Sequence, residues 1–214
     1  MFKTYFSIVT LKGVLMIIRK LFALLVLSLL SITTLAQAQE SGLGPDIGTK
    51  IPHDLSLMGT SGEMENFDRL KGDKGLAIFF TRSFDWCPFC QTQAKEVNAE
   101  AAAFRSRGFN PIFISYDTPE IQKNFTDRWE FTMPLLSDTG LEAIKAFGVL
   151  NENTSESSPL YGYPHPIVFL VDTDGVIQSK LYIENEAGTS GSSYRDRPGI
   201  DVILKAIDEM NNTD

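Results

Sequence analysis

The sequence predicts an α/β protein with one mixed central β-sheet and helices on both faces of that sheet. Short apolar runs, typical of buried strands, alternate along the chain with longer segments whose apolar residues recur at helical spacing. Two of these runs are separated only by the turn sequence of residues 172–175, which makes them antiparallel. The runs on either side of a helical segment are expected to be parallel, so the sheet is mixed.

The first buried strand is expected over residues 76–80, which are all apolar. A helix is expected over residues 88–107, because Pro88 suits a first helical turn and Gly108 suits the position after a last one. Residues 39–75 are rich in glycine, proline and polar groups. We interpret them as a short hairpin or an irregular lead-in.

The later elements repeat this alternation. A strand over residues 111–115 precedes a helix that begins with Thr118 as its N-cap and Pro119 in its first turn. The remaining elements are expected as a short strand, a short helix, two strands joined by the turn, and a last amphipathic helix, at residues 133–136, 141–147, 166–171, 176–183 and 200–210.

The charge of the chain is unevenly distributed. The 214 residues include 19 basic and 27 acidic ones, for a formal charge of -8. Residues 1–38 contain no acidic residue and four basic ones, so the rest of the chain carries 19 − 4 = 15 basic and 27 acidic residues, a charge of −12. A chain this acidic is not expected to bind nucleic acid.

Residues 1–38 have the features of a cleaved secretory signal. Basic residues precede an apolar run of about 12 residues, and small residues stand at the −3 and −1 positions of a cleavage site after Ala38. The alternative, a membrane anchor, needs about 20 apolar residues. Met16 fits a start of translation, because residues 1–15 add nothing that a signal needs. We therefore expect a periplasmic or secreted protein with no stable membrane span after cleavage.

Cys87 and Cys90 carry the clearest chemical signal. They are the only cysteines in the chain, and they lie in the segment Trp86-Cys-Pro-Phe-Cys between a predicted strand and a predicted helix. The amide groups and dipole of a first helical turn stabilise a thiolate and lower the pKa of Cys87. Cys90 lies one turn further on, within reach of a disulfide. A thiolate that attacks a disulfide and is then displaced by its neighbour forms a redox pair.

Three other uses of these cysteines fit the sequence less well. A structural disulfide across so short a loop removes little chain entropy. A zinc site needs four ligands, and only His53 and His165 could join the cysteines. Haem attachment needs histidine directly after the second cysteine, where this chain has Gln91. The redox pair is therefore preferred, and no organic cofactor is expected, since no glycine-rich phosphate loop is found.

These motifs resemble those of the thioredoxin-like redoxins, in particular the alkyl hydroperoxide reductase/thiol-specific antioxidant group that includes peroxiredoxins. The resemblance covers roughly residues 45–212, and it implies a thioredoxin fold with a redoxin domain at residues 76–214 after the lead-in. Its landmarks are Asp46-Ile-Gly48, Ile51-Pro52, Trp86-Cys-Pro-Phe-Cys90, Pro134-Leu-Leu-Ser-Asp138, Pro164-His-Pro166 and Asp172-x-x-Gly175.

The resemblance also implies roles for residues outside the cysteine pair. Pro166 matches the cis-proline that opens the strand beside the two cysteines, keeps metal off them and shapes the groove for the substrate backbone. Arg197 sits where peroxiredoxins have an arginine just before the last helix. Peroxiredoxins also carry Thr or Ser three residues before the peroxidatic cysteine and Pro four residues earlier, where this chain has Phe84 and Phe80. This departure puts peroxidase activity in doubt.

Several side chains near the motif have two interpretations. Arg82 and Arg197 could favour the Cys87 thiolate or be solvated surface residues. His165 could move protons or only pack beside the cysteines. Trp86 and Phe89 are expected to form an apolar rim around the thiols.

Three functions follow from these interpretations. The first is an exported thiol–disulfide oxidoreductase that acts on protein or small-molecule disulfides and is restored by a reducing thiol protein. The second is a thiol-dependent peroxidase, with Cys87 peroxidatic and Cys90 resolving. The third is a periplasmic metal-binding module that uses Cys87, Cys90 and His165.

Overall fold

The computed structural model describes residues 42–185 and 191–213. The predicted signal, residues 1–38, lies outside these ranges. Among the described residues, no helix has both the length and the apolar character that a membrane crossing requires.

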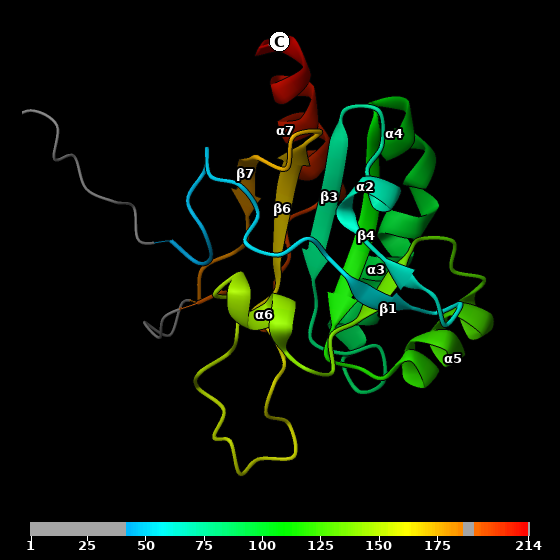
Figure 1. Ribbon diagram of the computed structural model, residues 1–214, viewed down its shortest axis with the longest axis vertical. Helices are drawn as coiled ribbons and strands as arrows, with labels where there is room; N and C mark the ends of the chain where they lie inside the picture. The colour runs from blue at the N-terminus through cyan, green and yellow to red at the C-terminus, as the bar shows by residue number, and fades with distance from the viewer. Residues whose placement is uncertain (1–41, 186–190, 214) are drawn as a thin grey trace, which may run out of the picture. The chain divides into compact units, whose positions relative to one another are not determined.

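The described residues form a mixed sheet, as the sequence predicts (Figure 1). This sheet has seven strands. The strand order is β2-β1-β5-β4-β3-β6-β7. In chain order the strands are β1 (Leu57–Gly59), β2 (Met64–Glu65), β3 (Gly75–Phe80), β4 (Phe109–Ser115), β5 (Leu135–Ser137), β6 (Ile167–Asp172) and β7 (Ile177–Leu181).

Strand β3 lies at the middle of the sheet and has two different neighbours. It pairs parallel with β4 along its whole length and antiparallel with β6. Strands β6 and β7, joined by the turn at residues 172–175, are antiparallel. Both predicted directions are therefore confirmed. All six residues of β3 are buried, because helices cover both faces of this strand.

Within residues 42–185 and 191–213, six helices accompany the sheet: α2 (Phe67–Leu70), α3 (Pro88–Ala99), α4 (Ala101–Ser106), α5 (Pro119–Trp129), α6 (Glu142–Ala146) and α7 (Ile200–Thr213). Successive residues of β3 point to opposite faces of the sheet. Leu76, Ile78 and Phe80 pack with residues of α2 and α6. Ala77 and Phe79 pack with residues of α3, α4 and α7.

Local sequence signals explain where the helices start. The Thr118 hydroxyl accepts a hydrogen bond from the backbone N–H of Ile121 at 3.3 Å, and Pro119 occupies the first helical position of α5. Cys87 caps α3 in the same way, because its sulfur accepts from the backbone N–H of Cys90. The predicted starts of both helices are confirmed.

Two elements differ from the sequence prediction. The expected single helix over residues 88–107 is interrupted at Glu100, whose φ of -98° and ψ of 12° make it both the C-cap of α3 and the N-cap of α4. Val97 and Phe104 still reach the same core, so apolar spacing alone does not reveal the break. The lead-in contains the expected hairpin, β1 and β2. It also contains the unexpected short helix α2, which is capped by the Asn66 side chain.

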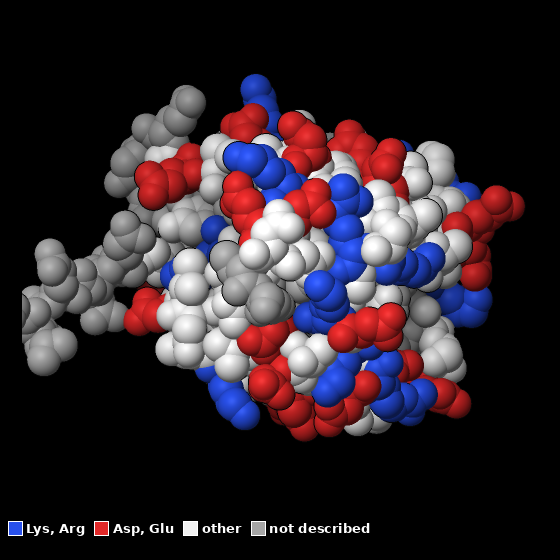
Figure 2. All heavy atoms as spheres, turned by 90° about the horizontal axis from the view of Figure 1, so that it is seen from above, with Lys and Arg blue, Asp and Glu red and all other residues white. Residues whose placement is uncertain are grey.

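The face of the molecule in Figure 2 carries basic and acidic side chains that are interspersed. Ion pairs such as Lys123–Asp127 and Lys205–Glu209 join exposed residues one helical turn apart. Pairs of this kind contribute little to stability, so the buried apolar layers hold the fold together.

Replacement of Phe79 by alanine tests the contribution of these layers. The Phe79 ring is 1% exposed and stacks on Phe113 with 4.6 Å between the ring centroids. We expect Phe79→Ala to lower the free energy of unfolding by about 3–5 kcal/mol, because it leaves a cavity that the sheet cannot close. The exposed Val202→Ala is the control, with an expected change within about 0.5 kcal/mol. Denaturant unfolding of the oxidised proteins measures both, and equal losses would contradict the assignment of this core.

Candidate active site

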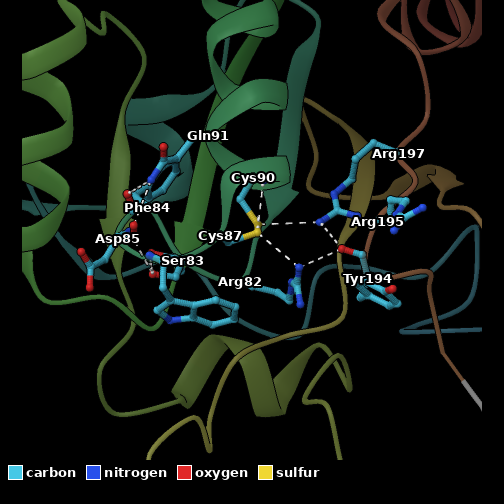
Figure 3. Close-up of a disulfide and its surroundings, with 12 residues drawn as sticks. Arg82, Ser83, Phe84, Asp85, Cys87, Cys90, Gln91, Tyr194, Arg195 and Arg197 are labelled. Carbon is cyan, nitrogen blue, oxygen red and sulfur yellow. Dashed lines mark hydrogen bonds between the residues drawn. A yellow bond between two sulfur atoms is a disulfide. The ribbon is translucent and has the colours of Figure 1, made fainter.

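The two cysteines lie where the central strand of the sheet ends. After β3 the chain passes through a loop, residues 81–86, to Cys87, and α3 begins at Pro88. Cys87 and Cys90 form a disulfide with an S–S distance of 2.08 Å and a Cα–Cα distance of 5.3 Å (Figure 3). Both residues are 0% exposed. The proximity that the sequence spacing predicts is therefore present.

Two guanidinium groups contact the disulfide from different parts of the chain. Arg82 comes from the loop after β3, and its Nη2 lies 3.4 Å from the Cys87 sulfur. Arg197 comes from the segment before α7, and its Nη2 lies 3.7 Å from the Cys90 sulfur. Figure 3 shows both side chains pointing at the sulfur atoms and at the carbonyl of Tyr194. The structure thus places both arginines beside the cysteines and not on the solvated surface.

Arg82 is buried, and Arg197 is partly buried. Arg82 lies between aromatic rings, with its guanidinium carbon 5.2 Å from the Trp86 ring centroid and 5.8 Å from that of Tyr163. Burial lowers the pKa of Arg82. Burial, followed by the nearby charge of Arg82, lowers the pKa of Arg197 to about 10. Both groups remain cationic at neutral pH, and in the dithiol form they favour a thiolate over a thiol.

A buried carboxylate fixes the loop that leads to Cys87. Asp117 is 4% exposed and accepts hydrogen bonds from the Ser83 hydroxyl and the Phe84 backbone N–H, each at 2.7 Å. It also accepts from the Ser115 hydroxyl at 2.9 Å. Burial raises the pKa of Asp117, and the bond from Phe84 opposes that rise. The sequence analysis did not identify Asp117 as a site residue. The one feature of the sequence that could have indicated it is its position just after the buried strand β4.

The side chain of Gln91 holds the other side of the same loop. Its Nε2 donates to the backbone carbonyls of Phe84 and Asp85, at 2.8 and 3.0 Å. Asp117 thus accepts from the backbone N–H of Phe84, and Gln91 donates to the backbone carbonyl of the same residue. The position of Cys87 relative to β3 is therefore fixed by hydrogen bonds as well as by helix capping.

Trp86 and Phe89 lie on either side of Cys87 in sequence and are partly accessible. Trp86 is half-buried, and its indole N–H donates to the Tyr116 hydroxyl at 2.9 Å. Phe89 is 36% exposed, and the Arg195 guanidinium lies 5.9 Å from its ring centroid. These positions suit the apolar rim that the sequence predicts.

His165 is buried beside a glycine. It is 7% exposed, its Nδ1 has no hydrogen-bond partner, and burial lowers its pKa. A Cβ atom at Gly191 would collide with the imidazole ring. Among the described residues, no hydrogen bond joins His165 to either cysteine, and no group of three or more His, Cys, Asp or Glu side chains is placed to hold a metal ion. The geometry thus brings the cysteines together without His165 as a third ligand.

The expectation of a cis-proline at Pro166 is wrong for this structure. The described backbone contains no cis peptide bond. The preceding residues run extended instead: Pro164 forms an isolated bridge with Leu150, and the His165 N–H donates to the Val149 carbonyl at 2.7 Å. This pairing leads directly into β6 with a trans His165–Pro166 bond, the isomer that most X–Pro bonds adopt.

The two positions that depart from the peroxiredoxin pattern are both core positions. Phe84 is 3% exposed and packs with Phe113 and Phe125 on one face of the sheet, and Phe80 packs with Phe147 on the other face. The nearby Ser83 hydroxyl is occupied by Asp117. The Thr81 hydroxyl is buried and has no hydrogen-bond partner.

Comparison with known proteins places these features in a family. Residues 47–180 match the model of the AhpC/TSA family. A putative peroxiredoxin of Mycobacterium tuberculosis (strain CDC 1551 / Oshkosh) is 32% identical over 149 residues, which are 70% of this chain and 92% of that protein. Peroxiredoxin Bcp of Escherichia coli (strain K12) is 30% identical over 124 residues, 58% of this chain and 78% of that protein.

The chain is also similar to a protein that is named a thiol-disulfide oxidoreductase and not a peroxiredoxin. Thiol-disulfide oxidoreductase ResA of Bacillus thuringiensis subsp. konkukian is 27% identical over 113 residues, 52% of this chain and 58% of that protein. The crystal structure of peroxidoxin BcpB from Mycobacterium tuberculosis matches 77% of this chain and 97% of its own, with a TM-score of 0.61 and 21% identity. That likeness shows the shared thioredoxin fold. The chain belongs to the AhpC/TSA family of redoxins and is a thiol-dependent oxidoreductase.

Proposed function

We propose that the protein is an exported thiol–disulfide oxidoreductase that uses Cys87 as its nucleophile and Cys90 as its resolving thiol. The observation that carries the proposal is the Cys87–Cys90 disulfide at the N-terminus of α3, with a guanidinium at each sulfur. Positive charge and the helix N-terminus both favour the thiolate that disulfide exchange requires.

The reaction proceeds by two displacements. The Cys87 thiolate attacks one sulfur of a substrate disulfide, forms a mixed disulfide and expels the first substrate thiolate, which takes up a proton. Cys90, as a thiolate, then attacks the Cys87 sulfur and expels the second substrate thiolate. Two electrons pass to the substrate and the Cys87–Cys90 disulfide remains. A reducing thiol protein restores the dithiol, and the reverse sequence oxidises thiols, depending on the redox poise of the compartment.

A thiol-dependent peroxidase is the second candidate, because two of the similar proteins carry the name peroxiredoxin. In that reaction Cys87 is oxidised to sulfenic acid by peroxide and Cys90 condenses with it, releasing water. The buried Phe84 weighs against it, since no hydroxyl is available at that position to orient a peroxide.

Replacement of each cysteine by serine tests the two displacements. We expect Cys87→Ser to abolish exchange with disulfides, because the attacking sulfur is gone. We expect Cys90→Ser to keep the first displacement and to accumulate the mixed disulfide, which intact-mass spectrometry detects. If Cys90→Ser traps nothing while Cys87→Ser does, the roles are reversed. If neither traps a substrate, disulfide exchange is not the reaction.

The peroxidase alternative is tested with the reduced wild-type protein. We expect hydrogen peroxide to consume its thiols no faster than those of free cysteine at equal thiolate concentration, because the peroxide-orienting hydroxyl is missing. Stopped-flow thiol titration gives the rate. A rate that exceeds that of free cysteine by several orders of magnitude would make the peroxidase the main function.

Export is tested by expression of the full chain in a bacterium with two membranes. We expect the mature protein in the periplasmic fraction with Gln39 as its first residue, because the small residues before Gln39 form the cleavage site. Cell fractionation and N-terminal mass spectrometry measure both. An uncleaved chain in the membrane fraction would support an anchor instead.

A further inference from the structure

Arg82 and Arg197 bring two positive charges to the cysteine pair. Neither guanidinium takes part in any ion pair found among the described residues. The nearest acidic side chain in sequence, Asp196, accepts a hydrogen bond from the Ser193 hydroxyl. A reduced site supplies one negative charge at the Cys87 thiolate, and among the described residues Asp196 acts on Arg197 only through space, without an ion pair.

Within the described part of the chain, backbone carbonyls, and not a carboxylate, accept the hydrogen bonds of the two guanidiniums. Arg197 donates through Nη1 to the carbonyls of Ser193 and Asp196 at 3.1 and 3.0 Å. The Tyr194 oxygen accepts a hydrogen bond from Arg82 at 2.8 Å and one from Arg197 at 3.4 Å. The Nε atoms of both arginines are buried and have no hydrogen-bond partner. A carbonyl has only a partial negative charge, whereas a carboxylate forms shorter and stronger bonds with guanidinium groups. A carboxylate would therefore bind the two guanidiniums more strongly than the carbonyls that they now contact.

The arginine pair also lies next to the reacting sulfur atoms. Both cysteines are 0% exposed, and the two guanidiniums are in contact with their sulfurs. A substrate disulfide bound at Cys87 therefore lies close to both positive charges. Arg197 also lines a hollow of about 350 Å³, together with the apolar side chains of Leu181 and Val202, which provides space for an organic group.

We propose that the arginine pair, Arg82 and Arg197, binds a carboxylate on the disulfide substrate, which replaces the Tyr194 carbonyl and holds the substrate sulfur at Cys87. The preferred substrates are thus organic disulfides that carry a carboxylate close to the sulfur. The overall charge of the chain would repel such anions, so a preference for them must come from a local site. This inference rests on the proposed disulfide exchange.

Three small disulfides of different charge test the preference. The probes are 3,3′-dithiodipropionate, which is anionic, bis(2-hydroxyethyl) disulfide, which is neutral, and cystamine, which is cationic. The rate of oxidation of the reduced protein is measured for each and divided by the rate of the same disulfide with 2-mercaptoethanol, which removes differences in intrinsic reactivity. We expect the normalised rate for the anionic probe to exceed that for the neutral one by about tenfold, with cystamine slowest and with the difference reduced in high salt.

Matched variants separate a binding role from a general effect on the thiols. Arg197→Gln is expected to remove most of the anionic-to-neutral ratio and Arg197→Lys to retain part of it. A change in thiolate content alters all three rates alike and leaves the ratio unchanged. Arg105→Gln, which removes an exposed arginine of α4, is the control and is expected to keep the wild-type ratio. A loss of the ratio in Arg105→Gln equal to that in Arg197→Gln would overturn the proposal.

An unreactive analogue gives a readout that does not require turnover. The thioether 3,3′-thiodipropionate has the same carboxylates but no disulfide bond, and we expect it to inhibit exchange competitively, while its diamide does not. Equal normalised rates for the three disulfides, with no inhibition by the thioether, would overturn the carboxylate site and leave disulfide exchange standing. If no disulfide reacts faster with the protein than with 2-mercaptoethanol, the proposed function itself fails and the carboxylate site fails with it.

Discussion

The pairing of β3 between β4 and β6 is the constraint on which the site depends. This strand is hydrogen-bonded on both sides and buried on both faces, so the point at which it ends is fixed. Asp117, at the corresponding end of β4, then ties down the loop that leaves β3. Cys87 consequently reaches the N-terminus of α3 at a defined place, and Arg82 is delivered to it by the same loop.

The electrostatics of the site follow from this placement. Burial of positive charge is costly, and the protein places two guanidiniums at one disulfide. Reduction and deprotonation of Cys87 create a negative charge beside Arg82, so the dithiol form relieves part of that cost. The site is therefore arranged to stabilise the reduced, ionised form of the pair relative to a site without these arginines.

The sequence predicted the parts of the molecule that depend on local patterns. The buried strands, the turn at residues 172–175 and the capped start of α5 each have a signal within a few residues, and each is found in the structure. The interruption of the helix at Glu100 has no such signal, because the residues on both sides keep the helical apolar spacing.

Within the site, the same division between local and long-range signals applies. The spacing of Cys87 and Cys90 is local and was predictable, whereas the approach of Arg197 joins residues more than a hundred positions apart. Asp117 belongs to no recognisable motif in the sequence, and the pairing of β4 with β3 brings its carboxylate to the backbone N–H of Phe84. The cis-proline was inferred from the resemblance alone, and the described backbone has no cis bond there.

The short span of the Cys87–Cys90 disulfide has a thermodynamic consequence. A covalent link between residues three apart restricts the unfolded chain very little, so chain entropy contributes little to the stability of the oxidised form. The fold is held instead by the apolar layers on the two faces of the sheet. By thermodynamic linkage, whatever the charges around the sulfurs add to the folding stability of the reduced form also raises the reduction potential of the pair by the same free energy. A newly made chain can thus complete its fold before it meets any oxidant, and electron transfer can be repeated without unfolding the domain.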